Sequence, residues 1–193
     1  MATHSCPQSA RTIGIVHPGR MGGTLAYDLK KSGHIVYWAS SGRSEATEER
    51  ANEFDLVDLV DVDTVLAKSE IVFCIAFGGA PLEIAKHVAT VGYDGIYVDA
   101  NGLWGEESEK EIASIINDAG ITYVEAGLYG WPHPGREGYT DEHTLYLSGE
   151  KADEIANLFS SGYWTTEVHP TSAKEVKRLR NDRERGTEFP EQE

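Results

Sequence analysis

The chain has 193 residues, a length typical of one domain with one sizeable hydrophobic core. Its 17 basic and 32 acidic residues give a formal net charge of −15, which argues against binding to the phosphate backbone of DNA or RNA. No apolar run approaches the roughly 20 residues of a membrane-spanning helix, and residues 1–10 lack the basic and apolar pattern of a signal peptide. We therefore expect a soluble, cytoplasmic protein with no nucleic-acid or membrane partner.

Cysteine and histidine do not form a metal-ligand pattern in this sequence. The two cysteines, Cys6 and Cys74, allow at most one disulfide, and Cys74 lies in an apolar run where a small buried thiol is ordinary. The seven histidines include no pair four residues apart and no cluster with cysteine. We expect no metal site.

Short apolar runs alternate with amphipathic stretches from Arg11 to about Glu125, a pattern typical of βαβ units on a parallel sheet. The strands predicted in this region are Thr12–Val16, His34–Trp38, a short one near Asp55–Val57, Glu70–Ile75, Gly95–Val98 and Ile121–Val124. A loop rich in glycine, proline and aromatic residues follows at Gly127–Tyr139, and two further strands are predicted at Thr144–Leu147 and Trp164–Val168. The sequence therefore predicts an α/β fold with a mainly parallel sheet.

Helices are predicted at Arg20–Lys31, Glu106–Ala119, Asp153–Ser160 and Thr171–Arg185. The first ends in two lysines before Gly33, and the second begins with acidic residues and ends before Gly120, which are the charge and glycine signals of helix ends. The last has only Ala173, Val176 and Leu179 as an apolar set among many charged residues. Such a helix needs a partner surface.

A glycine-rich turn links the first predicted strand to the first predicted helix. It reads His17-Pro18-Gly19-Arg20-Met21-Gly22, so the second and third glycines of a G-x-G-x-x-G fingerprint are kept and His17 replaces the first. In a dinucleotide-binding fold this turn lets a pyrophosphate approach the backbone at the helix N-terminus. The alternative is a plain glycine-rich turn, but the strand–turn–helix context favours cofactor binding. The fold class predicted is therefore Rossmann-type and doubly wound, with helices on both faces of the sheet.

The end of the second strand indicates which dinucleotide binds. A fold specific for NAD places an acidic residue here for the ribose hydroxyls. This chain has Ser40, Ser41 and Arg43 instead, and hydroxyls with a guanidinium suit a 2′-phosphate. The alternative is that these residues only cap the helix that follows, although the two roles do not exclude each other. We expect NADP as the cofactor, with NADPH preferred over NADH.

Three segments of the chain resemble one known family. They are Ile13–Gly22 (IGIVHPGRMG), Ser40–Ser44 (SSGRS) and Tyr97–Asn101 (YVDAN). Together they resemble the NADP-binding domain of the 6-phosphogluconate dehydrogenase and β-hydroxyacid dehydrogenase superfamily. The match is best to a poorly characterised branch of oxidoreductases that has the turn Pro-Gly-x-Met-Gly. The resemblance covers about residues 11–181.

The resemblance implies hydride transfer between a nicotinamide and a small hydroxy acid, carbonyl or imine, with a lysine as acid/base and an asparagine four residues later. Lys177 and Asn181 match that spacing and share a helix face. The alternative for Lys177 is a solvated basic helix end. Because ligands of open α/β sheets bind beyond the strand carboxyl ends, we expect the nicotinamide near Ala76, Phe77 and Asn101.

Two departures from the family affect the expected substrate site. The substrate-binding motif of the family aligns with residues 125–131, where Tyr129 replaces a serine, Gly130 is kept and Trp131 replaces a glycine. Family members also continue into a long helical domain that completes the substrate site and forms the dimer, whereas this chain stops at Glu193. We therefore expect the chain alone to be incomplete as an enzyme, without measurable turnover. The alternative is a non-catalytic NADP(H)-binding module or sensor.

The expected organisation follows from these points. Residues 1–10 form a flexible N-terminus, 11–170 the NADP-binding domain, 171–185 the start of a helix leading to an absent helical domain, and 186–193 a disordered tail. The expected partners are a small-molecule substrate and, through residues 171–185, a weak homodimer or a helical partner.

Overall fold

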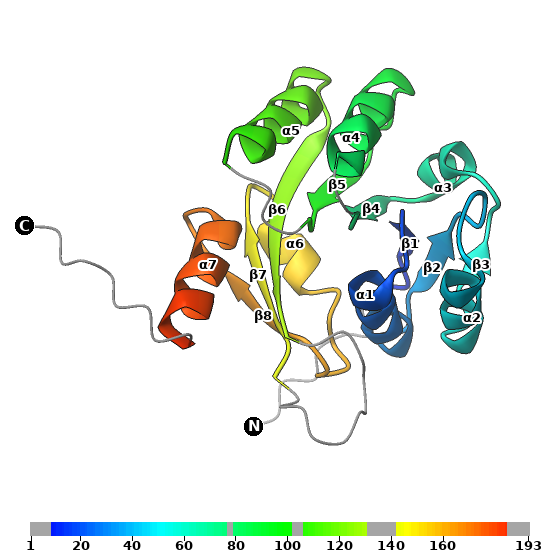
Figure 1. Ribbon diagram of the computed structural model, residues 1–193, viewed down its shortest axis with the longest axis horizontal. Coiled ribbons are helices and arrows are strands. Elements are labelled where there is room, and N and C mark those ends of the chain that lie inside the picture. Colours follow the sequence, from blue (N-terminus) through cyan, green and yellow to red (C-terminus); the bar gives the residue numbers. More distant parts are fainter. Residues whose placement is uncertain (1–8, 77–78, 102–105, 131–141, 185–193) are drawn as a thin grey trace, which may run out of the picture.

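An eight-stranded sheet with helices on both faces forms the centre of the computed structural model, which describes residues 9–76, 79–101, 106–130 and 142–184 (Figure 1). The strands are β1 (Thr12–Ile15), β2 (Ile35–Trp38), β3 (Val57–Asp58), β4 (Ile71–Cys74), β5 (Ile96–Asp99), β6 (Thr122–Tyr129), β7 (Thr144–Ser148) and β8 (Thr165–Val168). The helices are α1 (Arg20–Lys31), α2 (Glu45–Glu53), α3 (Val62–Lys68), α4 (Ala80–Thr90), α5 (Glu106–Asp118), α6 (Ala152–Ala156) and α7 (Ala173–Glu184).

The strand order is β3-β2-β1-β4-β5-β6-β7-β8, and β1 to β6 are all parallel. Strand β7 is antiparallel to β6, and β8 is parallel to β7. Strand order reverses between β1 and β4, which is the point where open α/β sheets bind their ligands. The predicted doubly wound α/β fold with a mainly parallel sheet is confirmed.

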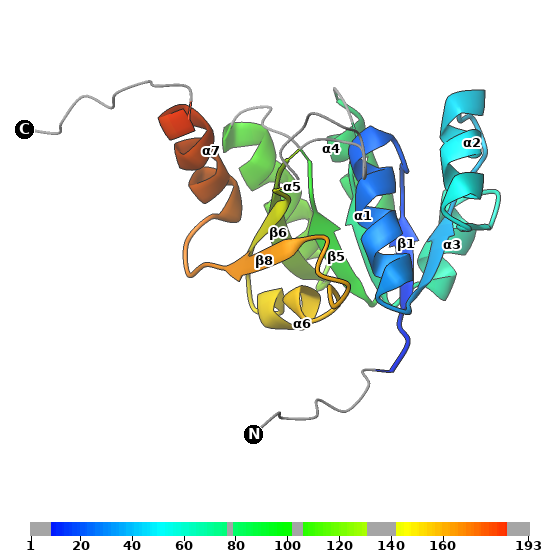
Figure 2. The ribbon, with the colours of Figure 1, turned by 90° about the horizontal axis from the view of Figure 1, so that it is seen from below.

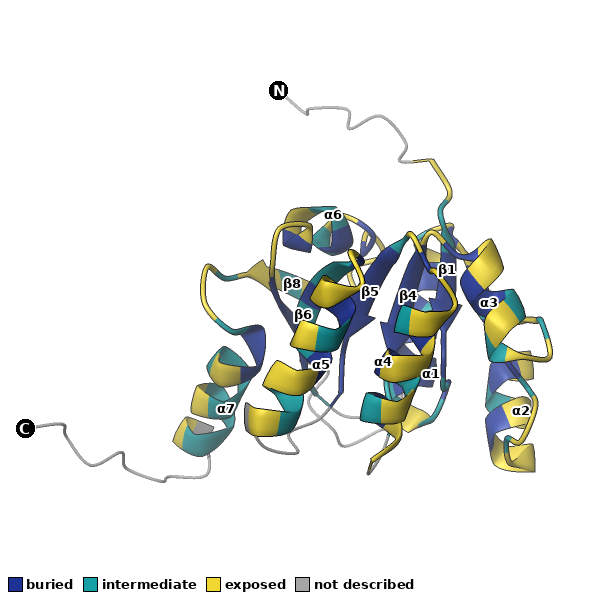
Figure 3. Cartoon of the chain, turned by 90° about the horizontal axis from the view of Figure 1, so that it is seen from above, coloured by how far each residue is buried: buried dark blue, intermediate teal, exposed yellow. Residues whose placement is uncertain are grey.

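Two hydrophobic clusters show how the sheet is covered on its two faces. One cluster joins β-strand side chains such as Ile13 and Phe73 to α1, α2 and α6, and the other joins Val72 and Tyr97 to α3, α4 and α5. Successive side chains of one strand belong to different clusters because they point to opposite faces of the sheet. Figures 2 and 3 show the helices on both sides of the sheet and the buried strands between them.

The largest difference from the predicted elements is the length of β6. The loop predicted from Gly127 begins too early, because β6 continues to Tyr129. Its second half is stabilised by antiparallel pairing with β7, from Glu125 opposite Ser148 to Tyr129 opposite Thr144. That partner lies far along the chain, so the local composition of glycine and aromatic residues did not reveal the strand. Helix α6 is also shorter than predicted, and α3 and α4 lie outside the predicted set.

Helix α7 packs on β6 and β7 of its own sheet. Ala173 and Lys174 are buried there, whereas Leu179 is 37% exposed. The partner surface that this helix requires is thus supplied in part by the same domain. Association of residues 171–185 with another chain remains a prediction.

The expected flexible N-terminus lies outside the described residues except for Ser9 and Ala10, and the expected tail, 186–193, lies outside them completely. Among the helices that the structure does describe, none has both the length and the apolar character required to cross a membrane.

Candidate functional site

A cleft of about 520 Å³ opens at the carboxyl ends of the parallel strands, where strand order reverses. The β1–α1 turn forms one wall, residues after β4 and β5 form the base, and α2 and α7 each contribute side chains. None of the described residues that line it is acidic. The cleft therefore suits a ligand that carries negative charge.

The β1–α1 turn comes close to its own helix at Gly22. A Cβ at this position would lie 2.3 Å from the carbonyl oxygen of His17, so only glycine fits without a backbone shift. Gly19 is the N-cap of α1, and the first turn of the helix contains no acidic residue. The helix thus presents free backbone N–H groups and the positive end of its dipole towards the cleft.

Two arginines from the region after β2 hold this turn. Arg43 donates to His17 Nδ1 over 3.0 Å and to the carbonyl oxygen of Val16 over 3.2 Å. Arg50 donates to the carbonyl oxygen of Pro18 over 3.1 Å. Burial, followed by the charges of Arg43 and Arg50, lowers the pKa of His17, so its ring is neutral and accepts the hydrogen bond from Arg43.

Most of the predicted cofactor-binding residues meet in the cleft. His17, Gly19, Arg20, Met21, Gly22, Ala76 and Asn101 line it. Pro18 lies in the same turn and contributes its carbonyl to Arg50. Phe77 lies outside the described residues.

Ser40, Ser41 and Arg43 do not line the cleft, although they lie next to it in sequence and structure. Arg43 is turned back against the β1–α1 turn, and its Nε is buried without a hydrogen-bond partner among the described residues. A carboxylate also lies beside Ser40, because Asp58 Oδ1 accepts from the backbone N–H groups of Ser40 and Val60. Asp58 is on β3 and does not line the cleft.

Lys177 enters the cleft from α7. Gly127 on β6 makes this approach possible, since a Cβ there would lie 2.8 Å from the carbonyl oxygen of Ala173 and 3.1 Å from Lys177 Cβ. Burial and the charge of Lys174 lower the pKa of Lys177, and Glu109 opposes this effect. Asn181, one turn further along α7, is half-buried and is not part of the lining.

Three of the basic residues near Lys177 are paired with carboxylates, whereas Arg183 is exposed. Lys174 is fully buried against Asp99, Arg178 forms an ion pair with Glu109 at 3.1 Å, and Arg180 forms one with Glu142 at 2.8 Å. The alternative considered for this helix therefore does not describe its environment.

The predicted substrate residues lie beside the cleft. Tyr129 does not line it, because its ring lies 3.8 Å below the guanidinium of Arg180 on the α7 side of β6. Gly130 has a φ of +130° and is also outside the lining, and Trp131 lies outside the described residues. Leu128, which points to the opposite face of β6 from Tyr129, does line the cleft.

Sequence reasoning missed several lining residues, namely Ser44, Ala46, Thr47, Arg50, Ile75, Ala100 and Leu128. One signal was available for three of them. Ser44, Thr47 and Arg50 are spaced three residues apart from the N-cap of α2 to its last turn, so they share one helix face.

The site fits a dinucleotide on observations of this chain alone. The Gly22 cradle excludes any side chain, a helix N-terminus faces the cleft, and Arg20 and Arg50 contribute positive charge without a neighbouring carboxylate in the lining. Within the described part of the chain, no group of three or more His, Cys, Asp or Glu residues is arranged to hold a metal ion.

Several solved structures have a similar fold. A conserved protein of unknown function, described as structurally similar to 3-hydroxyacid dehydrogenases, is 25% identical with a TM-score of 0.73, covering 91% of this chain and 65% of its own. An imine reductase from Myxococcus stipitatus in complex with NAD+ is 18% identical, with a TM-score of 0.69 and coverages of 93% and 62%. A reductive aminase from Aspergillus terreus in complex with NADPH is 14% identical, with a TM-score of 0.71 and coverages of 92% and 62%.

The chain thus spans less than two thirds of the length of these three proteins. At the level of fold, the resemblance to the cofactor-binding part of hydroxyacid dehydrogenases and related reductases is confirmed. No curated protein matches the chain in sequence. A family model for a Rossmann-like domain matches residues 2–105, which is more than half of the chain. The chain therefore belongs to the Rossmann-like domain family.

Proposed function

We propose that the cleft binds NADP(H) and that the chain is the cofactor-binding part of an oxidoreductase of the β-hydroxyacid dehydrogenase type. The observation that carries the proposal is the meeting of two distant features in one cleft. The glycine turn with Gly19 and Gly22 is near the start of the chain, and Lys177 is near its end. A nicotinamide cofactor, when bound, supplies or accepts the hydride.

The positive charge around the turn supports a preference for NADPH over NADH. Arg20 and Arg50 line the cleft, and Arg43 lies directly behind His17. The unpartnered Nε of Arg43 would gain a strong acceptor if the guanidinium turned towards a phosphate. Asp58 does not line the cleft, and its Oδ1 accepts from two backbone N–H groups. We assign the 2′-phosphate to Arg43 together with Ser40, Ser41 and Arg50.

Lys177 is the acid/base of the proposed reaction. In the reducing direction it donates a proton to the substrate oxygen or nitrogen while the adjacent carbon receives the hydride; in the oxidising direction it removes that proton. Partial burial lowers its pKa towards the range in which it exchanges protons readily. Asn181 lies one turn further along the same helix, where its amide can hydrogen-bond to the substrate.

The substrate is a small hydroxy acid, carbonyl or imine compound. Leu128, Ala76 and Ala100 give an apolar part to the cleft that Lys177 also lines, which suits a small and largely apolar compound. Tyr129, Gly130 and Trp131 follow Leu128 directly, and we assign them to the edge of the substrate site.

Calorimetric titration of the chain with NADPH and NADH tests the cofactor assignment. NADPH is expected to bind at least about tenfold more tightly, which corresponds to about 1.4 kcal/mol and is within reach of one charge-assisted contact. Arg43→Ala should remove most of this difference and leave NADH binding almost unchanged. The matched control is Arg11→Ala, since Arg11 pairs with Glu70 and Glu154 and lies outside the cleft. Equal affinities of the wild-type chain for the two cofactors would contradict the assignment.

A spectrophotometric assay tests whether the chain alone catalyses hydride transfer. NADPH oxidation is measured with small β-keto acids, aldehydes and cyclic imines, for the wild-type chain and for Lys177→Ala. Turnover that disappears in Lys177→Ala would support Lys177 as the acid/base and would overturn the expectation that the chain alone is incomplete as an enzyme. Tight NADPH binding without turnover is the expected result, and it fits an incomplete oxidoreductase as well as a non-catalytic NADP(H)-binding module.

A further inference from the structure

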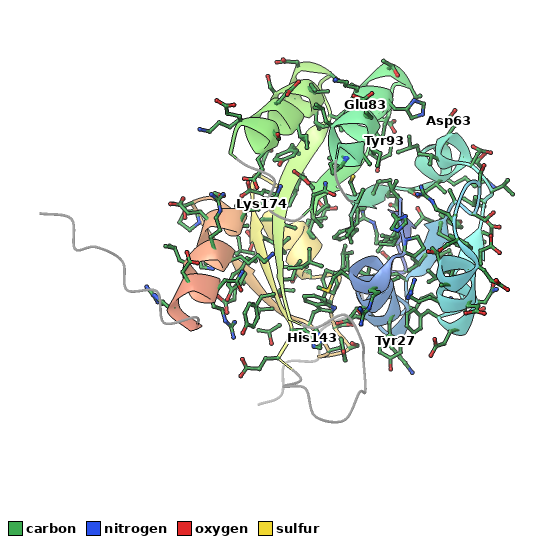
Figure 4. The ribbon with its side chains drawn as sticks, viewed as in Figure 1. Tyr27, Asp63, Glu83, Tyr93, His143 and Lys174 are labelled. Atoms are coloured by element: carbon green, nitrogen blue, oxygen red, sulfur yellow. The ribbon has the colours of Figure 1, made fainter. Side chains whose placement is uncertain are left out.

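An ion pair between Lys174 on α7 and Asp99 at the end of β5 is buried completely. Lys174 Nζ lies 2.7 Å from Asp99 Oδ2, and the two side chains are 1% and 0% exposed. Figure 4 shows Lys174 on the side of α7 that faces the sheet. The free energy lost when two charges leave water offsets much of their attraction inside the protein. A pair of apolar side chains at the same place often stabilises a fold to a similar extent. Stability alone therefore does not account for this pair.

Asp99 also fixes one part of the cleft. Its Oδ1 accepts from the side-chain amide of Asn101 over 2.5 Å and from the backbone N–H of Asn101 over 3.2 Å. The amide oxygen of Asn101 in turn accepts from the backbone N–H of Ala76 over 2.7 Å. Asn101 and Ala76 both line the cleft, so the orientation of Asn101 depends on Asp99. Tyr123 donates a further hydrogen bond to Asp99 Oδ2 over 3.1 Å.

Lys174 ties the helix that carries Lys177 to the end of β5. It precedes Lys177 by three residues on α7, so the two side chains are neighbours on the helix surface. The beginning of α7 is also held by Ala173 N–H, which donates to Ser148 Oγ over 3.1 Å. The link between Lys174 and Asp99 connects this helix directly to β5. It therefore joins the element that carries Lys177 to the strand that precedes Asn101.

We infer that Lys174 and Asp99 are positioning residues, which set the distance and the electrostatic environment of Lys177 relative to Asn101 in the cleft. The inference rests on the proposed function only in giving Lys177 its chemical role. The charged neighbours of Lys177 are Lys174 on its own helix and Glu109 on α5, and they act in opposite directions. If residue 174 carried no charge, Glu109 would still raise the pKa of Lys177, whereas the opposing effect of Lys174 would be lost.

The test measures the proton affinity of Lys177 in the chain without cofactor. The rate at which a small acylating reagent modifies Lys177 is followed against pH by mass spectrometry. The first variant is Lys174→Met, which leaves Asp99 buried without its counter-ion and is expected to be less stable. The second, Lys174→Met with Asp99→Asn, leaves no buried charge in the pair and has one acceptor oxygen where Asp99 has two, of which one accepts from Asn101 and the other from Tyr123. If the single variant does not fold, the acylation rate of Lys177 can still be measured in the double variant.

In the double variant, acylation of Lys177 at pH 7.5 should be about threefold slower or more, because loss of the positive charge of Lys174 raises the pKa of Lys177 and leaves less of its amine unprotonated. The dissociation constant for NADPH should also rise, because Asn101 is less firmly held. The matched control is Lys30→Met with Asp55→Asn. It removes an ion pair at the surface, in which Lys30 Nζ lies 3.0 Å from Asp55 Oδ2 and neither residue lines the cleft. This control should change neither the acylation rate of Lys177 nor the dissociation constant for NADPH. A folded double variant in which Lys177 reacts as in the wild type overturns the inference.

Failure of the proposed function gives a different result. If the wild-type chain does not bind NADPH, the proposed function fails, whereas the acylation rates still decide whether Lys174 and Asp99 position Lys177.

Discussion

The substitution Gly22→Ala tests the closest backbone contact of the cleft. The new Cβ would lie 2.3 Å from the carbonyl oxygen of His17, about 1 Å inside ordinary van der Waals contact. The contacted atom belongs to the backbone and cannot rotate away, so the turn or the first turn of α1 must move. Both parts of the structure form the wall against which a pyrophosphate would lie.

The expected loss of stability can be estimated from two opposing effects. Overpacking of this kind costs up to about 3 kcal/mol, and replacing glycine by alanine inside a helix returns about 1 kcal/mol. The net loss is then about 2 kcal/mol, which lowers Tm by about 4–8 °C for a chain of this size. Because the N–H groups of the turn are displaced, the dissociation constant for NADPH should rise at least about tenfold.

Differential scanning calorimetry and NADPH titration measure these two quantities. Gly79→Ala is the control, because a Cβ at Gly79 meets nothing within 4 Å and its φ of −76° suits alanine. This variant should keep its Tm within about 2 °C and bind NADPH as the wild type does. A Gly22→Ala chain that matches the wild type in both Tm and NADPH affinity would refute the close approach on which the cofactor site depends.

Three further predictions follow from the site and from α7. The pKa of His17 in the folded chain lies below its usual 6.5, so the unfolded chain takes up a proton first as the pH falls. The free energy of unfolding of the wild type, relative to that of His17→Gln, should therefore decrease below about pH 6.5 and be constant above about pH 7.5. Urea unfolding at a series of pH values measures this difference. Lys177→Met removes a partly buried charge, so it should raise the free energy of unfolding by about 1 kcal/mol while abolishing any turnover; a less stable variant would show that Lys177 supports the fold. The half-exposed side of α7 should give weak self-association in sedimentation equilibrium that Leu179→Lys removes, and a wild-type chain that stays monomeric at high concentration would contradict this.

The sequence alone determined the features that depend on local interactions. Strand β1, its turn and helix α1 are contiguous, and their apolar spacing, glycines and terminal lysines identify them without any distant partner. The positions of Gly19 and Gly22 in the cleft follow from the same segment, and so does the fold class, because alternating strands and helices leave few topologies. Lys177 was singled out by the resemblance of the sequence to a known family, and it lines the cleft.

The tertiary structure decided the features that depend on contacts between distant segments. Residues 126–129 belong to β6 only because β7 pairs with them, and this pairing turns Leu128 towards the cleft and Tyr129 towards Arg180. Arg43 is charged and close to the site in sequence, but its direction depends on hydrogen bonds to the β1–α1 turn. Lys174 is one of several basic residues on a charged helix, and no local pattern distinguishes a solvated lysine from a buried one. Its burial is set by Asp99, which is 75 residues away in sequence, because only a counter-ion brought there by the fold can hold that charge inside the protein.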